Sequence, residues 1–266
     1  YEAYRAEHNE VSIEDKPISL TGLKTVKKIH PDEFKREEST VWSFPNRGDW
    51  ATHKANYRGN WSPYIVRNVL EWYSSPGDLV LDQMVGGGTT LVECKVMGRD
   101  AIGVDINPNA VMLTLDRLNF EYNSYLETLP ETNIRLFQGD ARCLDWISDG
   151  AVDLVATHPP YANIIPYSKA NPIEGDLSRV HSLEEFFDAM SKIAGESYRV
   201  LKPGGHAAVL IGDTHKHAHY VPISHRPLDC FLGAGFVLRE DVIKLQWHTQ
   251  TMRGRWHPRF QRNFLL

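Results

Sequence analysis

Cysteine is scarce in this sequence, whose 266 residues include only Cys94, Cys143 and Cys230. Their number is odd, none are spaced as C-x-x-C, and each falls within a segment whose pattern is that of a regular element. This arrangement supports neither a disulfide framework nor a zinc knuckle. Few, unpaired cysteines are typical of a reducing compartment, so we expect a cytoplasmic protein.

Long apolar runs are also missing. No stretch approaches the roughly 20 apolar residues that a membrane-spanning helix needs, and the polar segment Tyr1–Glu10 lacks the apolar centre of a signal peptide. We therefore expect a soluble protein without a membrane partner. The first residue is not methionine, and Asn263–Leu266 is typical of the start of a strand. The chain is accordingly expected to be cropped at both ends.

An overall excess of basic residues is absent as well. Lys and Arg number 29 against 34 Asp and Glu, and a formal net charge of -5 argues weakly against a nucleic-acid partner. The exception is a stretch without acids that contains Lys244, Arg253, Arg255, Arg259 and Arg262, interleaved with Trp247, His248, Trp256, His257 and Phe260. Such a segment can follow a phosphate backbone while its aromatic rings stack on bases. We predict nucleic-acid contact here, with a solvated loop as the alternative.

From Leu79 onward, short β-branched runs alternate with longer amphipathic runs, which predicts a parallel sheet covered by helices. Predicted strands are Leu79–Val85, Ala101–Ile106, Ile134–Gln138, Val152–Ala156, Ala207–Ile211 and Phe236–Leu245. Predicted helices are Thr89–Met97, a segment starting at Pro108, Leu183–Val200 and Pro222–Leu232. We expect one α/β domain, residues 51–266, with a doubly wound, mostly parallel sheet and an antiparallel edge strand. Residues 1–50 show weak periodicity and are expected to be an N-terminal extension.

Each candidate motif follows a predicted strand, and open parallel sheets bind ligands at the carboxyl ends of their strands. Gly86-Gly87-Gly88 opens a helix, so its backbone can approach a ligand closely and its N–H groups can face a carboxylate. Leu91 occupies the third glycine position of the dinucleotide pattern, which disfavours a pyrophosphate relative to a smaller adenosyl ligand. A tight strand-to-helix connection is the alternative interpretation.

Acidic residues end two successive strands beside this glycine turn. Asp105 is placed to accept both hydroxyls of a ribose, and Asp140 is placed to accept from an adenine amino group. Asp82 either holds the glycine loop or reaches a ligand amino group. Each acid alone could be a helix cap, but together with the glycine turn they favour adenosine.

The tetrapeptide His158-Pro159-Pro160-Tyr161 predicts a pocket for a planar base with an exocyclic amine. Such an amine is a poor nucleophile because its lone pair is delocalised into the ring. The Pro159 carbonyl and an acceptor at His158 can take hydrogen bonds from it, the prolines fix the backbone, and Tyr161 offers a stacking face. Neutral imidazole has one acceptor nitrogen, and with an ordinary pKa of about 6.5 it could also take the released proton. A rigid Pro-Pro turn is the alternative.

Five segments together resemble the DNA amino-methyltransferase family, which makes N4-methylcytosine or N6-methyladenine. They are Trp42–Pro45, Gly59–Pro63, Asp82–Thr90, Gly103–Pro108 and Thr157–Tyr161. The resemblance covers most of the chain from about Trp42 onward. It implies a Rossmann-like class I methyltransferase fold and S-adenosylmethionine as cofactor.

The resemblance also implies site roles. Asn60 to Pro63 would close over the cofactor, and Thr89 and Thr90 would line its methionine part. The full set of expected cofactor-binding residues is Asn60, Trp61, Ser62, Pro63, Asp82, Gly86, Gly87, Gly88, Thr89, Thr90, Asp105, Ile106, Asn107, Asp140, Ala141 and Thr157. The expected catalytic residues are His158, Pro159, Pro160 and Tyr161. Tyr167 and Lys169, in a loop that could close over the base, and Arg253, Arg255 and Arg259 are expected to contact nucleic acid.

The family usually has Asp, Asn or Ser where this sequence has His158, which leaves the choice of base open. The surrounding Thr157–Tyr167 resembles the Ser-bearing cytosine branch, so cytosine is favoured over adenine. The expected function is methylation of a flipped DNA base by the modification enzyme of a restriction system, and a cognate restriction endonuclease is a candidate partner. The gap between glycine loop and tetrapeptide is too short for a separate target-recognition domain.

The sequence also allows other functions. An RNA amino-methyltransferase would share the base pocket and differ in contacts to the 2′-hydroxyl. A non-catalytic nucleic-acid-binding subunit would retain the fold, although the intact glycine loop and paired acids favour a working cofactor site. Methylation of a protein glutamine is less favoured, because that chemistry prefers Asn at position 158. No metal site is predicted, since the alternating His215, His217 and His219 lack a carboxylate or thiolate set.

Overall fold

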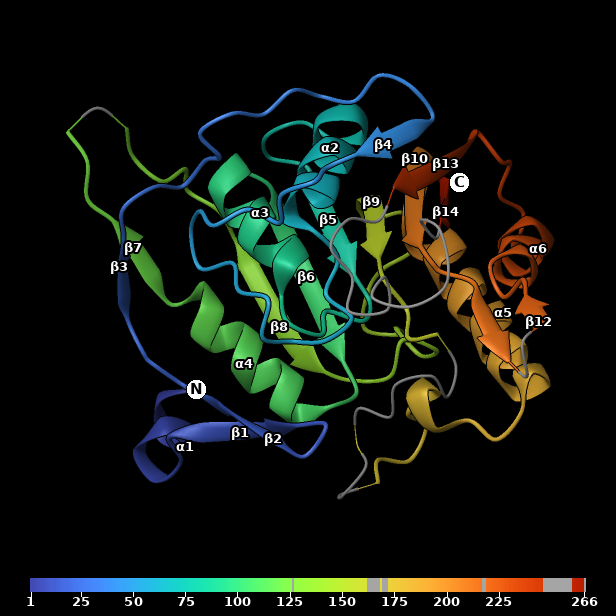
Figure 1. The fold of residues 1–266 in the computed structure, drawn as a ribbon, viewed down its shortest axis with the longest axis horizontal. Helices are drawn as coiled ribbons and strands as arrows, with labels where there is room; N and C mark the ends of the chain where they lie inside the picture. The colour runs from blue at the N-terminus through green and yellow to red at the C-terminus, as the bar shows by residue number, and fades with distance from the viewer. Residues whose placement is uncertain (126, 162–167, 169–171, 217–218, 246–259, 266) are drawn as a thin grey trace.

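The computed structural model describes residues 1–125, 127–161, 168, 172–216, 219–245 and 260–265, and gives the backbone alone for 214–216, 219 and 260–265 (Figure 1). Its centre is an eight-stranded sheet in the order β4-β13-β14-β10-β9-β5-β6-β8. These strands are β4 (Val41–Ser43), β5 (Leu79–Asp82), β6 (Asp100–Asp105), β8 (Ile134–Gln138), β9 (Val152–Thr157), β10 (Leu201–Leu210), β13 (Glu240–Leu245) and β14 (Phe260–Leu265). From β10 to β8 all neighbouring strands run parallel.

The predicted α/β class with a doubly wound, mostly parallel sheet is confirmed, but the antiparallel strand is not at the edge. β14 lies between β10 and β13 and runs antiparallel to both. The edge strand is β4, which pairs in parallel with β13 through Val41 opposite Ile243. A strand from the first 50 residues thus extends the sheet, which the weak periodicity of that region did not predict.

Helices cover both faces of the sheet (Figure 1). They are α2 (Pro63–Tyr73), α3 (Thr89–Met97) and α4 (Pro108–Leu118) before β8, and α5 (Leu183–Val200) and α6 (His225–Ala234) after β9. On one face α2 and α3 bury Ile65, Leu70 and Leu91 against the strands. On the other face, α5 and α6 bury Phe186 and Phe231. Each face of the sheet therefore has its own apolar core.

Local signals explain where these helices begin and end. Pro63 and Pro108 stand in the first turns of α2 and α4, where a missing N–H costs nothing. The Asn107 side chain caps α4 by accepting from the Asn109 N–H at 2.9 Å. Gly88 and Gly98 bracket α3 in left-handed conformations, so the predicted bounds of this helix are confirmed.

Residues 201–205, which separate the predicted helix Leu183–Val200 from the predicted strand Ala207–Ile211, are part of β10. This strand follows α5 directly, and its register with β9 shifts between Leu201 and His206. Gly204 has a φ of +81°, and a Cβ on Gly205 would lie 2.9 Å from the Asp153 carbonyl oxygen. The two glycines therefore form a bulge within a strand rather than a connection before it.

The N-terminal residues form small elements packed against the domain. They are α1 (Glu2–Glu7), β1 (Glu10–Ile13), β2 (Lys16–Ser19) and β3 (Lys24–Val26), which pairs with β7 (Phe120–Tyr122). Hairpin β1–β2 packs Val11, Ile13 and Ile18 on α4. Such short elements give little periodicity, which is why the sequence predicted an N-terminal extension without assigning its elements; the division at residue 50 remains a prediction.

The remaining elements are the short hairpin β11 (Thr214–Lys216) and β12 (His219–Val221) and the 3-10 turn η2 (Leu177–Arg179). Within the described ranges, no helix combines the length and apolar character needed to cross a membrane.

Candidate active site

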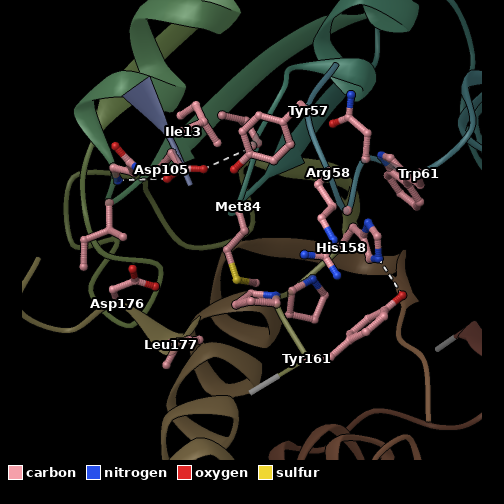
Figure 2. A pocket seen from close by; sticks show the side chains of 18 of the residues that line it. Ile13, Tyr57, Arg58, Trp61, Met84, Asp105, His158, Tyr161, Asp176 and Leu177 are labelled. Atoms are coloured by element: carbon pink, nitrogen blue, oxygen red, sulfur yellow. Dashed lines mark hydrogen bonds between the residues drawn. The ribbon is translucent and has the colours of Figure 1, made fainter. Parts of the chain in front are cut away.

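A pocket of about 800 Å³ lies where β5, β6, β8 and β9 end. Its size is typical of small-molecule sites. Figure 2 shows Asp105, Asp176 and Leu177 toward one end, His158 and Tyr161 toward the other, and Met84 between them. The pocket can therefore hold two groups side by side, one near the acids and one near the tetrapeptide.

Twelve of the 20 predicted cofactor-binding and catalytic residues line this pocket. They are Asn60, Trp61, Gly86, Asp105, Ile106, Asn107, Asp140, Ala141, His158, Pro159, Pro160 and Tyr161. The predicted residues that do not line it are Ser62, Pro63, Asp82, Gly87, Gly88, Thr89, Thr90 and Thr157. Members of this second group are largely buried behind the wall or begin a helix, so they support the site rather than face it.

The glycine loop is tied to the protein rather than pointing its N–H groups at the pocket. The Gly86 N–H donates to Asp105 Oδ2 at 2.8 Å, and the Gly88 N–H donates to the Val85 carbonyl at 2.8 Å. The expectation that these groups face a ligand carboxylate is therefore wrong for Gly86 and Gly88. The value of glycine here is its lack of a side chain, since a Cβ on Gly87 would lie 2.3 Å from Arg117 Nη1.

Helix α4 holds the loop from behind. Arg117 is buried and donates to the Gly87 carbonyl and, at 2.6 Å, to Asn56 Oδ1. Thr114 Oγ1 donates to the Gly86 carbonyl at 3.2 Å. Burial lowers the pKa of Arg117 to about 10.

Asp82 holds the loop, which was one of its two predicted roles. It is buried and accepts from Thr90 Oγ1 at 2.5 Å and from the Met84 N–H at 3.2 Å. Burial raises the pKa of Asp82 to about 7. Because Thr90 turns inward to this carboxyl, it joins the glycine loop to β5 and is not on the pocket wall.

Asp105 lines the pocket, and its carboxylate oxygens can accept further hydrogen bonds. Its two oxygens accept one N–H each, from Asn107 and Gly86, both at 2.8 Å. A carboxylate oxygen can accept two hydrogen bonds, so each oxygen can still take one from a ligand. Burial raises the pKa of Asp105 to about 6. A pair of hydroxyl donors, as on a ribose, fits this arrangement.

Asp140 forms an ion pair with Arg142. Arg142 donates its Nε to Oδ1 at 2.9 Å and its Nη2 to Oδ2 at 2.5 Å, and its backbone N–H reaches Oδ1 at 2.9 Å. Burial opposes ionisation, but these hydrogen bonds leave the pKa of Asp140 lowered. The carboxylate is thus charged and oriented at the pocket wall, with much of its acceptor capacity already used.

The segment before α2 closes another side of the pocket. Arg47 donates to the carbonyls of Asn60 and Trp61 at 3.3 and 3.4 Å, which fixes both residues. Within the described residues, Asn60 Nδ2 is buried without a hydrogen-bond partner. A buried, unused amide donor beside the glycine loop is unusual in a protein interior and fits a polar ligand group.

The tetrapeptide forms the opposite end of the pocket. His158 Nε2 and Tyr161 Oη lie 2.7 Å apart, and the His158 ring lies 5.9 Å from that of Trp61 (Figure 2). Burial, with Lys244 and Arg47 nearby, lowers the pKa of His158 to about 3. The imidazole is therefore neutral and a poor proton acceptor near neutral pH, against the expectation of proton uptake.

Two cations lie near this end. Arg47 and Lys244, which lies in β13, both line the pocket. Burial and the charge of Arg47 lower the pKa of Lys244 to about 8. The cations and the neutral imidazole make this end of the pocket suited to an anion beside a planar ring.

Other predicted contacts lie outside the described residues. These are Tyr167, Lys169, Arg253, Arg255 and Arg259. In the basic stretch that starts at Lys244, the structure describes the side chain of Lys244 but not those of the later basic residues.

Sequence reasoning missed several residues that line the pocket. Ile13, Glu14 and Lys16 come from hairpin β1–β2, and Arg58 donates to Glu14 at 3.5 Å across the rim. The alternation of Val11, Ile13, Ile18 and Leu20 around a polar turn was the available signal for this hairpin. Tyr57, Gln83, Met84, Asp176, Leu177 and Lys244 were also missed as pocket residues.

Comparison with protein families gives one match over residues 3–116, to the N6/N4 methyltransferase family described as DNA methylase. Three curated relatives match parts of the chain. The type II methyltransferase M.HpaI of Haemophilus parainfluenzae is 42% identical over 87 residues, 33% of this chain and 28% of that protein. M.MjaII of Methanocaldococcus jannaschii is 42% identical over 52 residues, 20% and 10% of the two chains. The DNA adenine methyltransferase YhdJ of Escherichia coli is 26% identical over 127 residues, 47% and 43%.

The matched part thus spans less than half the length of each of these relatives. Among solved structures, a SAM-dependent methyltransferase from Methanosarcina mazei superposes with a TM-score of 0.52 at 15% identity. The superposition covers 74% of this chain and 95% of that chain. At this identity the likeness shows the fold, which is the Rossmann-like class I methyltransferase fold that the sequence predicts.

Proposed function

We propose that this chain is a member of the DNA amino-methyltransferase family, to which its family match and its curated relatives point, and that it transfers a methyl group from S-adenosylmethionine to the exocyclic amine of a DNA base. The observation that carries the proposal is a single pocket with Asp105 and the glycine loop at one end and His158-Pro159-Pro160-Tyr161 at the other. One end suits a nucleoside with a ribose, and the other suits a planar base. Methyl transfer requires both groups to meet in one enclosed space.

S-adenosylmethionine supplies an electrophilic methyl group when it is bound. Asp105 would accept from the ribose hydroxyls, using the acceptor capacity that Asn107 and Gly86 leave. The unused Asn60 amide would donate to the methionine part. Asp140 would lie at the adenine end, where its ion pair with Arg142 fixes it. Asp82, Thr90 and Arg117 would act through the glycine loop.

The tetrapeptide would bind and orient the base amine. The Pro159 carbonyl accepts one amine hydrogen, and the two prolines fix the direction of that carbonyl. Localising the nitrogen lone pair makes it a better nucleophile for in-line attack. The N–C bond forms as the sulfonium S–CH3 bond breaks and its electron pair stays on sulfur, which leaves a neutral thioether. The nitrogen becomes cationic and afterwards loses one proton to water. Tyr161 presents its ring to a base extruded from the duplex.

His158 would act without changing its charge. Its low pKa keeps the ring neutral, so the imidazole adds no positive charge of its own beside the methyl donor. The contacts with Tyr161 and Trp61 hold the ring in place. We therefore assign His158 the role of shaping the base pocket.

Cytosine N4 is the base position we favour over adenine N6, from the resemblance of Thr157–Tyr167 to the cytosine branch. The names of the relatives support a role as the modification enzyme of a restriction system, since several are type II methyltransferases. A cognate restriction endonuclease would then recognise the same sequence. The enzyme would work in the cytoplasm, with residues 51–266 as its methyltransferase domain and residues 1–50 as an extension of that domain.

The test is isotopically labelled S-adenosylmethionine offered with separate pools of DNA and RNA, followed by digestion and mass spectrometry of the nucleosides. Label in N4-methyldeoxycytidine or N6-methyldeoxyadenosine supports the proposal and identifies the base. Label confined to a ribonucleoside would move the assignment to RNA. If neither pool is labelled while calorimetry detects cofactor binding, DNA methylation is excluded under these conditions and a protein substrate becomes the next candidate.

A further inference from the structure

Gln83 is a buried polar residue that none of the roles above uses. It follows β5 directly, is 1% exposed, and lines the pocket. In the parallel register Leu81 lies opposite Val155, so Gln83 is level with Thr157, the residue before His158. The carboxamide thus lies in the wall of the pocket, close to the start of the tetrapeptide.

The oxygen of the Gln83 carboxamide has a hydrogen-bond partner, and its nitrogen has none among the described residues. Gln83 Oε1 lies 3.0 Å from Ser197 Oγ on α5, whereas Nε2 is buried without a hydrogen-bond partner in the described part of the chain. Buried side-chain amides normally satisfy both ends. An unused end on a pocket wall therefore indicates a ligand contact.

Which end of the Gln83 amide lacks a partner depends on where the single proton of the Ser197 hydroxyl goes. Ser197 Oγ lies 2.8 Å from the Ile193 carbonyl as well as 3.0 Å from the Gln83 amide, but it has one proton to donate. If that proton goes to Ile193, the nearer acceptor, the amide must turn over and donate Nε2 to Ser197 Oγ. Oxygen and nitrogen of an amide exchange places without any change in shape. The unused end is then the carbonyl oxygen, an acceptor.

The pocket needs such an acceptor. An exocyclic amine has two hydrogens, and the Pro159 carbonyl can take one. His158 could take the second, but its Nε2 lies 2.7 Å from Tyr161 Oη. When that hydroxyl donates to Nε2, the single acceptor nitrogen of the neutral imidazole is already used. A neutral acceptor at the end of the neighbouring strand β5 would accept the second amine hydrogen.

We propose that Gln83 contacts the substrate directly, its carbonyl oxygen accepting the second hydrogen of the base amine while Ser197 holds the amide in that orientation. This inference rests on the proposed function and deepens it. It places the amine between two carbonyl acceptors, Pro159 and Gln83, instead of between Pro159 and His158. Both acceptors are uncharged.

The test compares Gln83→Leu, Gln83→Glu and Ser197→Ala with the wild type in single-turnover methylation of unmethylated genomic DNA fragments. Gln83→Leu should lower the rate about tenfold, the size expected for one hydrogen bond, with the cofactor dissociation constant unchanged by calorimetry. Ser197→Ala should lower it about threefold. Ser191→Ala is the matched control, because Ser191 makes the same bond to the carbonyl four residues earlier, at 3.0 Å, on the same helix.

Gln83→Glu separates substrate contact from packing. The introduced carboxyl has the same shape and is a better acceptor once ionised, so the rate of this variant should rise with pH as it loses its proton. The wild type should show no such rise from this position. A purely structural residue would give no such rise, because ionising a buried carboxyl without a donor would only destabilise its surroundings.

Two outcomes overturn the proposal while leaving DNA methylation intact. One is Gln83→Leu at the wild-type rate. The other is a loss in Gln83→Leu that is matched by equal losses of cofactor affinity and thermal stability, which would make Gln83 a packing residue. A wild-type protein that labels neither DNA nor RNA would instead remove the proposed function, and this inference with it.

Discussion

Asp105 is the residue whose chemistry should be most visible in cofactor binding. Its pKa is raised to about 6 by burial, so the carboxyl is ionised at pH 8 and becomes protonated as the pH falls through 6. The ionised form is the better acceptor for ligand hydroxyls. Affinity for S-adenosylmethionine should therefore be full above about pH 7 and decline below it, as measured by calorimetry between pH 5.5 and 8.

Asp105→Asn is the informative variant for this prediction. Its amide must turn one N–H toward Gly86 or Asn107, which are both donors, so the cofactor should bind more weakly by about 2 kcal/mol, a typical value for a charged hydrogen bond. The decline of affinity below pH 7 should disappear. A variant that keeps the same pH dependence would assign the titration to another group, such as Asp82.

His158 should leave no titration of its own in the rate of methyl transfer. Its pKa is lowered to about 3 by burial and by the two cations nearby, so the ring stays neutral from pH 5.5 to 8. His158→Ala should lower the single-turnover rate about tenfold through lost packing on Trp61 and Tyr161, with the shape of the pH–rate curve unchanged. A wild-type step near pH 6.5 that vanishes in this variant would show that His158 does take a proton.

At the scale of elements, the glycine loop depends on α4 behind it. A Cβ on Gly87 would lie 2.3 Å from Arg117 Nη1 and 2.7 Å from Asn60 Oδ1, and Arg117 is buried and held by its hydrogen bonds to the Gly87 carbonyl and Asn56. Gly87→Ala should weaken cofactor binding at least tenfold and destabilise the fold by about 2 kcal/mol, in the range for overpacking. Thermal melting and calorimetry measure the two effects.

Gly195→Ala in α5 is the matched control, because nothing lies within 4 Å of its Cβ position. An alanine inside a helix should be neutral or stabilising by up to about 1 kcal/mol. If both variants behave alike, steric crowding at Gly87 is not what requires glycine there.

Glu93 links α3, α2 and the segment between β4 and α2 through one buried carboxylate. It is fully buried in α3 and accepts from Arg67 Nε at 2.9 Å, Trp50 Nε1 at 2.6 Å and His53 Nε2 at 2.7 Å. Removing it leaves the Arg67 charge buried without this partner, which typically costs about 3 to 5 kcal/mol. Glu93→Ala should lower the melting temperature accordingly, whereas the exposed Glu131→Ala should not.

The elements also show what a sequence can predict. Helix α3 was predicted residue for residue because its limits are set locally, by glycines at both ends. The edge position of β4 was not predicted, since a three-residue strand has too little pattern of its own and depends on pairing with β13, far along the chain. Gln83 escaped notice for the same reason: its burial comes from α5, more than a hundred residues later.

For the whole molecule, the unequal distribution of charge matters more than its sum. A chain with a net charge of -5 must gather its cations where a polyanion is to bind. Arg47 and Lys244 lie together in the pocket wall near His158, although β4 and β13 bring their segments from opposite ends of the chain. The sequence predicted a basic segment starting at Lys244, but not that Arg47 would join it.

This pairing predicts how DNA binding should respond to pH and salt. Burial and the charge of Arg47 lower the pKa of Lys244 to about 8, so Lys244 is charged below that pH and neutral above it. DNA affinity should therefore fall as the pH rises from 7 to 9, and Lys244→Met should remove most of that fall. The slope of log affinity against log salt should be shallower by about 1 in the variant. An unchanged slope with an unchanged pH dependence would mean that the phosphate contacts lie elsewhere, and charge reversal at Arg253 and Arg255 would be the next measurement.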